Sequence, residues 1–365
     1  MIYLDNGATS FHKPPSVRKA MLDTMLRCAN PGRGGYGAAM AAAERVFACR
    51  QAAAAMFHCQ PEQVVLTANC THGLNIAIGT LVSAGDTVVV SGFEHNAVTR
   101  PLYARGAHVI VAGRRLFDSA DTLESFEWAL KRGAKAAIFT HASNVFGYIL
   151  PIRQLAELCK RYSVPFIIDA AQSAGILPID LQELGADFIA MPGHKGLLGP
   201  QGTGILLCNR MPEPLLHGGT GSASMEQAMP DFLPDRAEAG TLNVPGIGGL
   251  TAALGYLRRI GIATVAKREQ EQLHRCVRGL IKLGLQPFYG ENQLGIVSFL
   301  PPMDCEEAAG RLAKRDIAVR AGLHCAPLAH ESAGTLTTGT VRVSFGHDAN
   351  SSQTDIFLAA AAALR

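Results

Sequence analysis

Short apolar runs rich in valine and isoleucine recur along the first two thirds of the chain and predict β-strands. They cover residues 63–68, 86–92, 107–113, 135–141, 164–169, 187–191 and 202–208. Apolar spacings of three and four predict helices between several of them, as in the segment 152–162. Runs that are continuously apolar rather than alternating are typical of a parallel sheet covered by helices on both faces. The pattern therefore predicts an α/β protein.

The pattern changes after about residue 245. Helical stretches at 246–261 and 264–284 precede an apolar run at 295–302, a charged helix, a second run at 340–345 and a final helix at 355–365. This order predicts a smaller α+β domain. No repeat of fixed period and no low-complexity linker separates the two parts, so we expect them to share an interface and a cleft.

Composition narrows the function classes. The 33 Lys+Arg against 30 Asp+Glu give a formal charge of +3 without a basic run, which favours neither nucleic acid nor an anionic membrane as a partner. The N-terminus has no apolar signal region, and no apolar run of about 18 residues occurs. We therefore expect a soluble cytoplasmic protein that acts on a small polar substrate.

The nine cysteines are odd in number and lack the C-x-x-C and Cys/His spacings of a zinc site, which predicts a reducing compartment and no metal. We expect eight of them to be small core residues. Cys325 differs, because its segment "RAGLHCAP" has the composition of an exposed loop. It lies beside His324 and between two arginines in sequence, and these neighbours could favour the thiolate. A buried, inert thiol is the alternative.

Polar residues follow the predicted strands, where open parallel sheets bind their ligands. They are Thr71 with His72, His95, His141 with Asn144, Asp169 with Gln172, and His194 with Lys195.

Asp169 and Lys195 are the two groups that pyridoxal phosphate requires, a carboxylate for the pyridine nitrogen and an amine for the Schiff base. Taken singly, the aspartate could be a helix N-cap and the lysine a solvated surface residue. Thr71 reads as the N-cap of a helix whose free N–H groups would face a phosphate, although a plain cap is the alternative. Two loops, 218–222 and 238–243, could also approach a phosphate.

A set of ordered motifs resembles one enzyme family along nearly the whole chain. The motifs are "YLDNGAT", "EHNAVTRP", "THASNVFG", "IIDAAQS", "GHKGLLGPQGTG", "EAGTLN" and "RAGLHCAP". They resemble the class V, fold-type I pyridoxal-phosphate enzymes, and among these the cysteine desulfurases and selenocysteine lyases. The resemblance implies a mostly parallel seven-stranded sheet in a three-layer large domain plus a smaller α+β domain. It also implies an N-terminal arm over residues 1–15 that packs with the small domain, a cofactor-binding domain over 16–250, and a small domain over 251–365 with the cysteine loop.

The resemblance implies a role for each matching residue. Lys195 would bond to the cofactor and move the Cα proton, Asp169 would pair with the pyridine nitrogen, Gln172 with the phenolic oxygen, and His95 would stack on the ring. The phosphate would be held by Thr71, His194 and, from a second subunit, Thr241, with His72 as a further cofactor-binding residue. Asn144 and Arg342 would bind the substrate carboxylate, Arg320 would brace the cysteine loop, and Arg33 would reach the neighbouring active site of a homodimer.

The implied reaction converts L-cysteine to L-alanine while Cys325 takes the sulfur as a persulfide and passes it to an acceptor protein or thiol. L-Selenocysteine is the alternative substrate. An aminotransferase, epimerase or C–S lyase with an incidental Cys325 is another possibility, and a non-catalytic scaffold is a more distant one. Two departures from the family pattern leave the substrate open: Pro192 stands where a small hydroxyl residue is common, and Leu323 stands where a polar residue is frequent.

Overall fold

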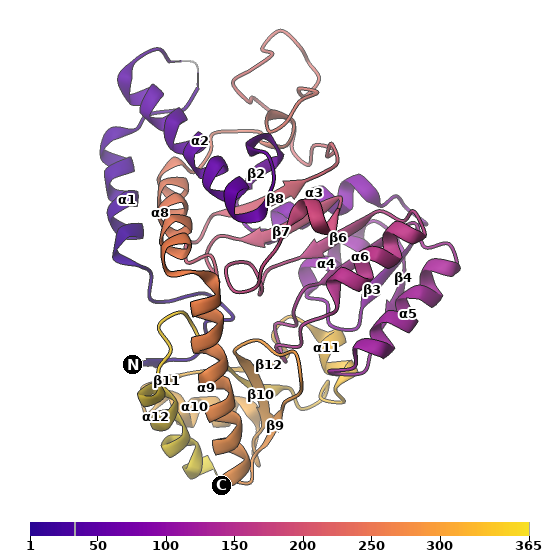
Figure 1. The fold of residues 1–365 in the computed structure, drawn as a ribbon, viewed down its shortest axis with the longest axis vertical. Coiled ribbons are helices and arrows are strands. Elements are labelled where there is room, and N and C mark those ends of the chain that lie inside the picture. Colours follow the sequence, from indigo (N-terminus) through magenta and orange to yellow (C-terminus); the bar gives the residue numbers. More distant parts are fainter. Residues whose placement is uncertain (33, 365) are drawn as a thin grey trace.

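The computed structural model describes residues 1–32 and 34–364. A large sheet with its helices forms the upper part of Figure 1, and a smaller sheet lies below it beside both ends of the chain. The long helix α9 (Ile262–Lys282) runs along the smaller part.

The seven predicted strands all form, and they make one sheet. They are β2 (Val64–Thr67), β3 (Thr87–Ser91), β4 (His108–Ala112), β5 (Ala136–Thr140), β6 (Phe166–Asp169), β7 (Phe188–Pro192) and β8 (Gly204–Cys208). Their order is β2-β8-β7-β6-β5-β3-β4. β8 runs antiparallel to both of its neighbours, β2 and β7, and the other pairs are parallel. The predicted α/β class with a mostly parallel sheet is therefore confirmed.

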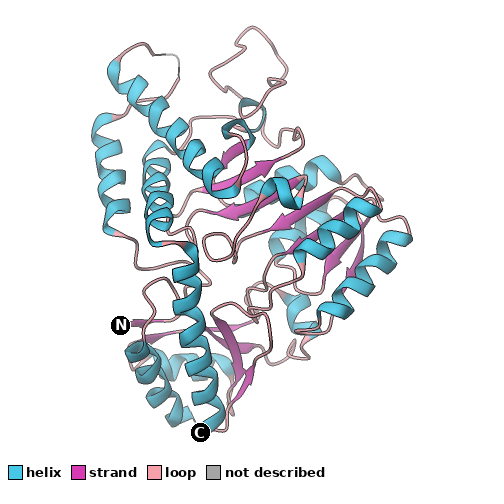
Figure 2. Cartoon of the chain, in the orientation of Figure 1, coloured by secondary structure: helices cyan, strands magenta, loops and turns pink. Residues whose placement is uncertain are grey.

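Helices cover both faces of this sheet (Figure 2). One face packs on α2 (Gly37–Phe57), α5 (Ser119–Lys131), α6 (Ile152–Arg161) and α8 (Val244–Ile260), and the other on α3 (Cys70–Leu81) and α4 (Asn96–Ala104). Successive strand residues serve opposite faces, so Val89 joins the first core and Val88 the second. Two buried faces explain why the strands are apolar throughout.

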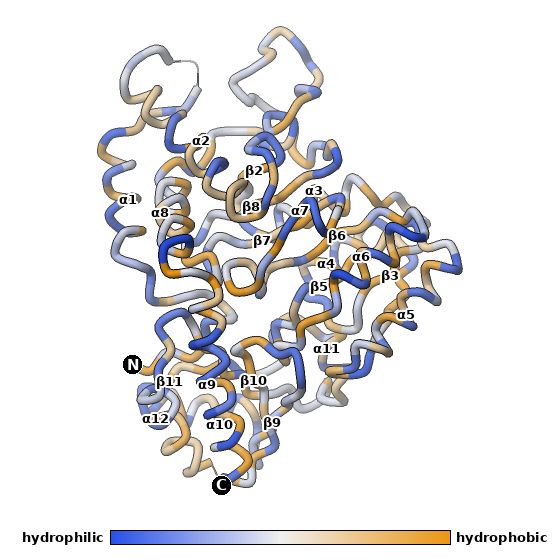
Figure 3. Tube along the Cα trace, in the orientation of Figure 1, coloured by the Kyte–Doolittle hydropathy of each residue, from blue (hydrophilic) through white to orange (hydrophobic). Residues whose placement is uncertain are grey.

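The smaller sheet is antiparallel, in the order β12 (Arg320–Gly322), β13 (Thr340–Ser344), β10 (Ile296–Leu300), β9 (Gln286–Phe288). With α9, α10 (Cys305–Ala313) and α12 (Ser351–Ala361) it encloses a separate core that includes Leu273, Phe299 and Phe357. In Figure 3, α9 alternates between hydrophilic and hydrophobic colours, as a helix with one buried face should.

The N-terminal arm packs against the smaller part of the molecule. β1 (Ile2–Tyr3) pairs in parallel with β11 (Ile317–Ala318), and Asp5 bridges to Ser344. α1 (Pro15–Arg27) then packs on α8. The boundary suggested at 250/251 falls inside α8, which also contacts α2, so the domain limits stay a prediction. Within the described residues, no helix has both the length and the apolar character needed to cross a bilayer.

Candidate active site

A cavity of about 640 Å³ opens at the carboxyl ends of the parallel strands. Most of the residues predicted to bind the cofactor line it, namely Thr71, His95, Asn144, Asp169, Gln172, His194 and Lys195. Its size lies in the usual range for small-molecule sites. The topology accounts for the convergence, because β3, β5, β6 and β7 are parallel neighbours and end at the same edge.

Asp169 and Lys195 form a buried acid–base pair in this cavity. Asp169 ends β6 and is 2% exposed, and its Oδ1 accepts a hydrogen bond of 2.8 Å from the N–H of Ala171. Burial raises the pKa of Asp169, while the Ala171 bond and Lys195 oppose the rise. Burial lowers the pKa of Lys195, and Asp169 opposes that change. The site thus holds an amine with a reduced proton affinity and a carboxylate in need of a cationic partner.

The N-terminus of α3 faces the same cavity, but Thr71 is not its N-cap. The cap is Asn69, whose side chain accepts the N–H of His72 at 2.9 Å. Asn69 O accepts the N–H of Gly73, which leaves the N–H groups of Cys70 and Thr71 for a ligand. Asn and Thr are both common N-cap residues. Here Asn69 is the cap, because its side-chain carbonyl accepts the third N–H of the helix. An anion-binding helix end is preserved.

His95 is the N-cap of α4, and its ring is neutral. Its Nδ1 accepts the N–H of Ala97 at 3.0 Å, so the proton of the neutral ring is on Nε2. Burial, with the charges of Lys195 and Arg320 as further causes, lowers the pKa of His95 to about 4. A neutral imidazole with a free N–H suits a position against a flat aromatic ligand.

The N-terminal arm contacts two residues that line the cavity. Gln172 Nε2 donates to Gly7 O at 3.0 Å, and His194 Nδ1 lies 3.0 Å from Thr9 Oγ1. Burial lowers the pKa of His194 to about 4, with Lys195 and Lys13 as further causes. The arm therefore orients two of the predicted cofactor ligands.

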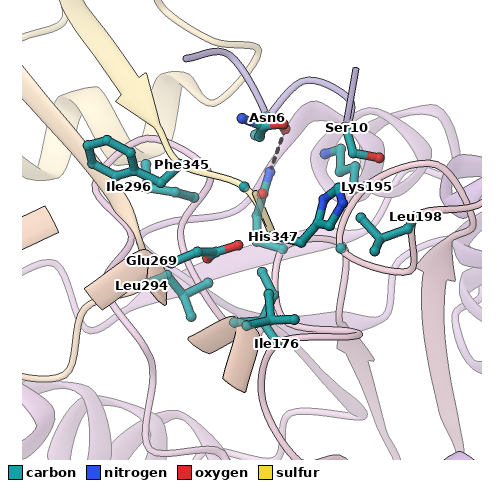
Figure 4. Close-up of a pocket in the computed structure, with 15 residues that line it drawn as sticks. Asn6, Ser10, Ile176, Lys195, Leu198, Glu269, Leu294, Ile296, Phe345 and His347 are labelled. Carbon is teal, nitrogen blue, oxygen red and sulfur yellow. Dashed lines mark hydrogen bonds between the residues drawn. The ribbon is translucent and has the colours of Figure 1, made fainter. Parts of the chain in front are cut away.

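A second cavity of about 430 Å³ adjoins the first, because Gln172 and Lys195 line both. Figure 4 shows the Glu269 carboxyl pointing into it beside His347. Glu269 is 4% exposed, and burial raises its pKa well above the ordinary value, with the charge of Asp348 adding to the rise. Sequence reasoning missed Glu269, which lies in an ordinary amphipathic helix with no motif around it.

The cysteine loop places the Cys325 side chain at the surface. Cys325 is exposed, whereas the other eight thiols are buried or half-buried. His324 and Cys325 both have left-handed backbones, with φ of 49° and 57°. Asn144 Nδ2 donates a hydrogen bond of 2.8 Å to His324 O, and the N–H of Asn96 donates one of 2.8 Å to Cys325 O. A strained pair of this kind persists only where the surroundings fix it.

The suggestion that His324 favours the thiolate of Cys325 is wrong. The His324 ring turns inward, 3.2 Å from Thr340 Oγ1 and stacked on His330. Burial lowers the pKa of His324 to about 2, with Arg342 as the next cause, so the ring carries no charge to share with the thiol. The consecutive left-handed residues send the two side chains apart.

Arg342 and Arg320 are neighbours across β12 and β13. Arg342 is 1% exposed; its Nη1 donates to Asn144 O at 2.9 Å and its Nη2 lies 2.6 Å from Asp5 Oδ1. Its Nε is buried and has no partner among the described residues. A guanidinium has more N–H donors than these two bonds use, so donors remain for a carboxylate.

Of the predicted site residues that the structure describes, five do not line the main cavity: Cys325, Arg320, Arg342, His72 and Thr241. His72 and Thr241 line a different cavity of about 840 Å³, and His72 Nδ1 accepts the N–H of Ala68. Arg33 lies outside the described residues. Thr241 follows a buried ion pair in which Glu238 accepts two bonds from Arg50, at 2.8 and 2.6 Å. That pair fixes the loop on which Thr241 lies.

A comparison with protein families matches the description "aminotransferase class-V" to residues 2–357. The chain belongs to this family. Probable cysteine desulfurases from Pyrococcus abyssi and Methanothermobacter thermautotrophicus are each 34% identical, over 94% and 96% of this chain and 89% and 91% of the relatives. The solved apo structure of a cysteine desulfurase from Thermococcus onnurineus NA1 has a TM-score of 0.89 at 30% identity, covering 98% of this chain and 92% of that one.

Membership of the class V family brings pyridoxal 5′-phosphate as the cofactor, and the cavity fits it. Asp169 supplies the buried carboxylate that a ring nitrogen needs, and Lys195 supplies an amine with lowered proton affinity. The free N–H groups of α3 suit a phosphate. The predicted family, fold type and cofactor are confirmed, while the individual residue roles stay predictions.

Proposed function

We propose that this protein is a cysteine desulfurase that converts L-cysteine to L-alanine and takes the sulfur on Cys325. The observation that carries the proposal is an exposed thiol whose loop is hydrogen-bonded to the cofactor cavity. Asn144, which lines the cavity, holds the residue before the thiol, and Asn96, next to His95, holds the thiol's own carbonyl. A cysteine that is incidental to the reaction would not need two such anchors. The relatives named as probable cysteine desulfurases support the same assignment.

Each residue then has one task. Pyridoxal phosphate, when bound, supplies the electron sink that makes the substrate Cα–H acidic. Asp169 would keep the ring nitrogen protonated, and Lys195 Nζ, which burial favours in its neutral form, would take the Cα proton. Asn144 and Arg342 bind the substrate carboxylate.

Cys325 carries out the sulfur transfer. Its thiolate attacks the substrate sulfur, so that an S–S bond forms as the C–S bond breaks. The electron pair of the broken bond stays with Cβ, which gains a proton. Lys195 would return its proton to Cα, and the three-carbon fragment leaves as L-alanine. Cysteine and a thiol thus become alanine and a persulfide, with no external oxidant. His95, neutral with its proton on Nε2, is placed to donate a proton inside the cavity.

We further propose a cytoplasmic homodimer in which Thr241 and Arg33 reach the cofactor site of the second subunit, beside Thr71, His72 and His194 for the phosphate. Large apolar side chains on α1 support a covered face, since Leu22, Met25 and Leu26 are 59%, 66% and 76% exposed. The nine free thiols suit a reducing compartment. An acceptor protein or a small thiol takes the sulfur from the exposed Cys325.

The test supplies L-cysteine to the cofactor-loaded protein and measures L-alanine and sulfide in the presence of a reductant. Cys325→Ala should lower alanine release by a factor on the order of 10³. Cys59→Ala, which removes a half-buried thiol at the end of α2, is the control and should leave it unchanged. Continued amino transfer to a 2-oxo acid by Cys325→Ala would indicate an aminotransferase. Selenide release from L-selenocysteine by the same variant, with none from L-cysteine in the wild type, would indicate a selenocysteine lyase.

A further inference from the structure

We propose that Cys70 is a positioning residue that donates its S–H to Asp169 and so aims the carboxylate at the ring nitrogen of the cofactor. The proposal rests on the cofactor assignment but not on the desulfurase reaction. It gives a second thiol a function in the site, distinct from that of Cys325.

The contact is defined by two buried side chains. Cys70, the first residue of α3, is 8% exposed and lines the cofactor cavity with Asp169. Its Sγ lies 3.5 Å from Asp169 Oδ1, within the range of a sulfur hydrogen bond. No sequence feature distinguishes Cys70 from the other cysteines that are expected to be small core residues.

The two donors to Asp169 share one oxygen. The N–H of Ala171 and the thiol of Cys70 both reach Oδ1, and among the described residues none donates to Oδ2. A carboxylate fixed through one oxygen cannot rotate freely, so the other oxygen is held toward the cavity. That second oxygen is the one available to a ring nitrogen.

Cys70 acts as a donor and not as a nucleophile. Burial raises the pKa of the Cys70 thiol well above its ordinary value, and the charge of Asp169 raises it further. The group therefore keeps its proton at neutral pH. A hydrogen bond to the ionised form of Asp169 favours that form and opposes the effect of burial. An ionised Asp169 in turn favours a protonated ring nitrogen.

The experiment compares Cys70→Ser, which keeps a donor, with Cys70→Ala, which removes it, and uses no substrate. Cys159→Ala is the control, because Cys159 is buried in α6 and does not line the cavity. Pyridoxal phosphate is titrated into each apo-protein, and the visible absorbance of the bound cofactor is followed from acid to alkaline pH. Chemical unfolding of each apo-protein shows whether it is folded.

We expect Cys70→Ala to bind the cofactor about fivefold more weakly, the worth of one hydrogen bond. The pH midpoint of its absorbance change should rise, because a ring nitrogen that is less firmly protonated withdraws fewer electrons. Cys70→Ser should stay near the wild type. The proposal is overturned if Cys70→Ala matches Cys159→Ala in both measurements, or if Cys70→Ser moves as far as Cys70→Ala. Because no turnover is measured, failure of the desulfurase reaction would not affect these results.

Discussion

Arg342 Nη2 lies 2.6 Å from Asp5 Oδ1, which joins the N-terminal arm to β13 across 337 residues of sequence. The guanidinium is 1% exposed, and a Cβ on Gly7 would come within 3.2 Å of its Cζ, so the arm lies flat against it. The same guanidinium holds Asn144 O. We infer that Asp5 sets the plane in which Arg342 presents its remaining donors to a carboxylate.

Replacing Asp5 with asparagine tests this relationship. The change leaves Arg342 buried without a counter-charge, so the free energy of unfolding should fall by about 3 kcal/mol. The KM for L-cysteine should rise about tenfold while kcat changes less, because the role proposed for Arg342 is to bind the substrate carboxylate and not to react. Denaturant unfolding and steady-state alanine release measure the two effects.

Asp316→Asn is the matched control, because Asp316 pairs with the N-terminal amine at an exposed position. Exposed pairs are worth at most about 1 kcal/mol, so this variant should resemble the wild type. An unchanged KM in Asp5→Asn would remove Asp5 from the substrate site.

The buried pair Arg50–Glu238 should control the loop of Thr241. Glu238→Gln leaves Arg50 without its counter-charge. It also weakens the two bonds that Glu238 accepts from Arg50 and the one it accepts from the N–H of Leu66, so stability should fall by about 3–5 kcal/mol. If Thr241 of the partner subunit binds the phosphate, the variant should also hold pyridoxal phosphate more weakly. The double replacement Arg50→Met with Glu238→Leu should recover much of the lost stability. Additive losses in the double variant would contradict the account.

Pro192→Ser should improve cofactor binding. Pro192 ends β7 and lines the cofactor cavity, where it offers neither a hydroxyl nor an N–H. A serine restores both, and we expect the dissociation constant of pyridoxal phosphate to fall about threefold. Pro165→Ser, at the opposite end of the sheet before β6, is the control in the same absorbance titration. Weaker binding by Pro192→Ser would show that the ring of the proline packs on the ligand.

We expect Glu269 to make the protein less stable at alkaline pH. Its folded-state pKa is raised well above the ordinary value by burial, so the folded state favours the protonated form. The stability that this protonation contributes is present in full below the ordinary pKa and is lost as pH rises toward the folded value. The free energy of unfolding of Glu269→Gln should therefore exceed that of the wild type by about 1–3 kcal/mol at pH 8, and the two should differ little at pH 4.5.

Glu271→Gln, on the exposed side of α9, should change neither value. A destabilised Glu269→Gln would mean instead that the carboxylate is ionised and paired with a cation in the cavity of Figure 4.

The large sheet could be predicted because its strands are buried on both faces and are therefore apolar without interruption. The convergence of Asp169 and Lys195 followed from the rule that parallel strands end at one edge. Exposure of Cys325 followed from the composition of its loop. These features depend on short stretches of sequence.

Features that depend on contacts between distant residues, or on the backbone conformation of single residues, could not be predicted from the sequence. The sequence contains both Asn69 and Thr71 as possible caps, and only the geometry of the turn selects the first. His324 adjoins Cys325 in sequence, yet two left-handed residues separate their side chains. Glu269 and Cys70 lie in helices without a sequence motif. Each becomes a candidate functional residue only because it lines a cavity that residues from other segments complete.

The most direct test of the account is the mass of the peptide that contains Cys325 after one turnover without reductant. The cofactor-loaded protein is mixed with equimolar L-cysteine, quenched, alkylated and digested. We predict that this peptide gains the mass of one sulfur atom in proportion to the L-alanine released, and that the other cysteine peptides do not. Alanine release without sulfur on Cys325, or sulfur on another cysteine, would contradict the assignment of Cys325 as the sulfur acceptor.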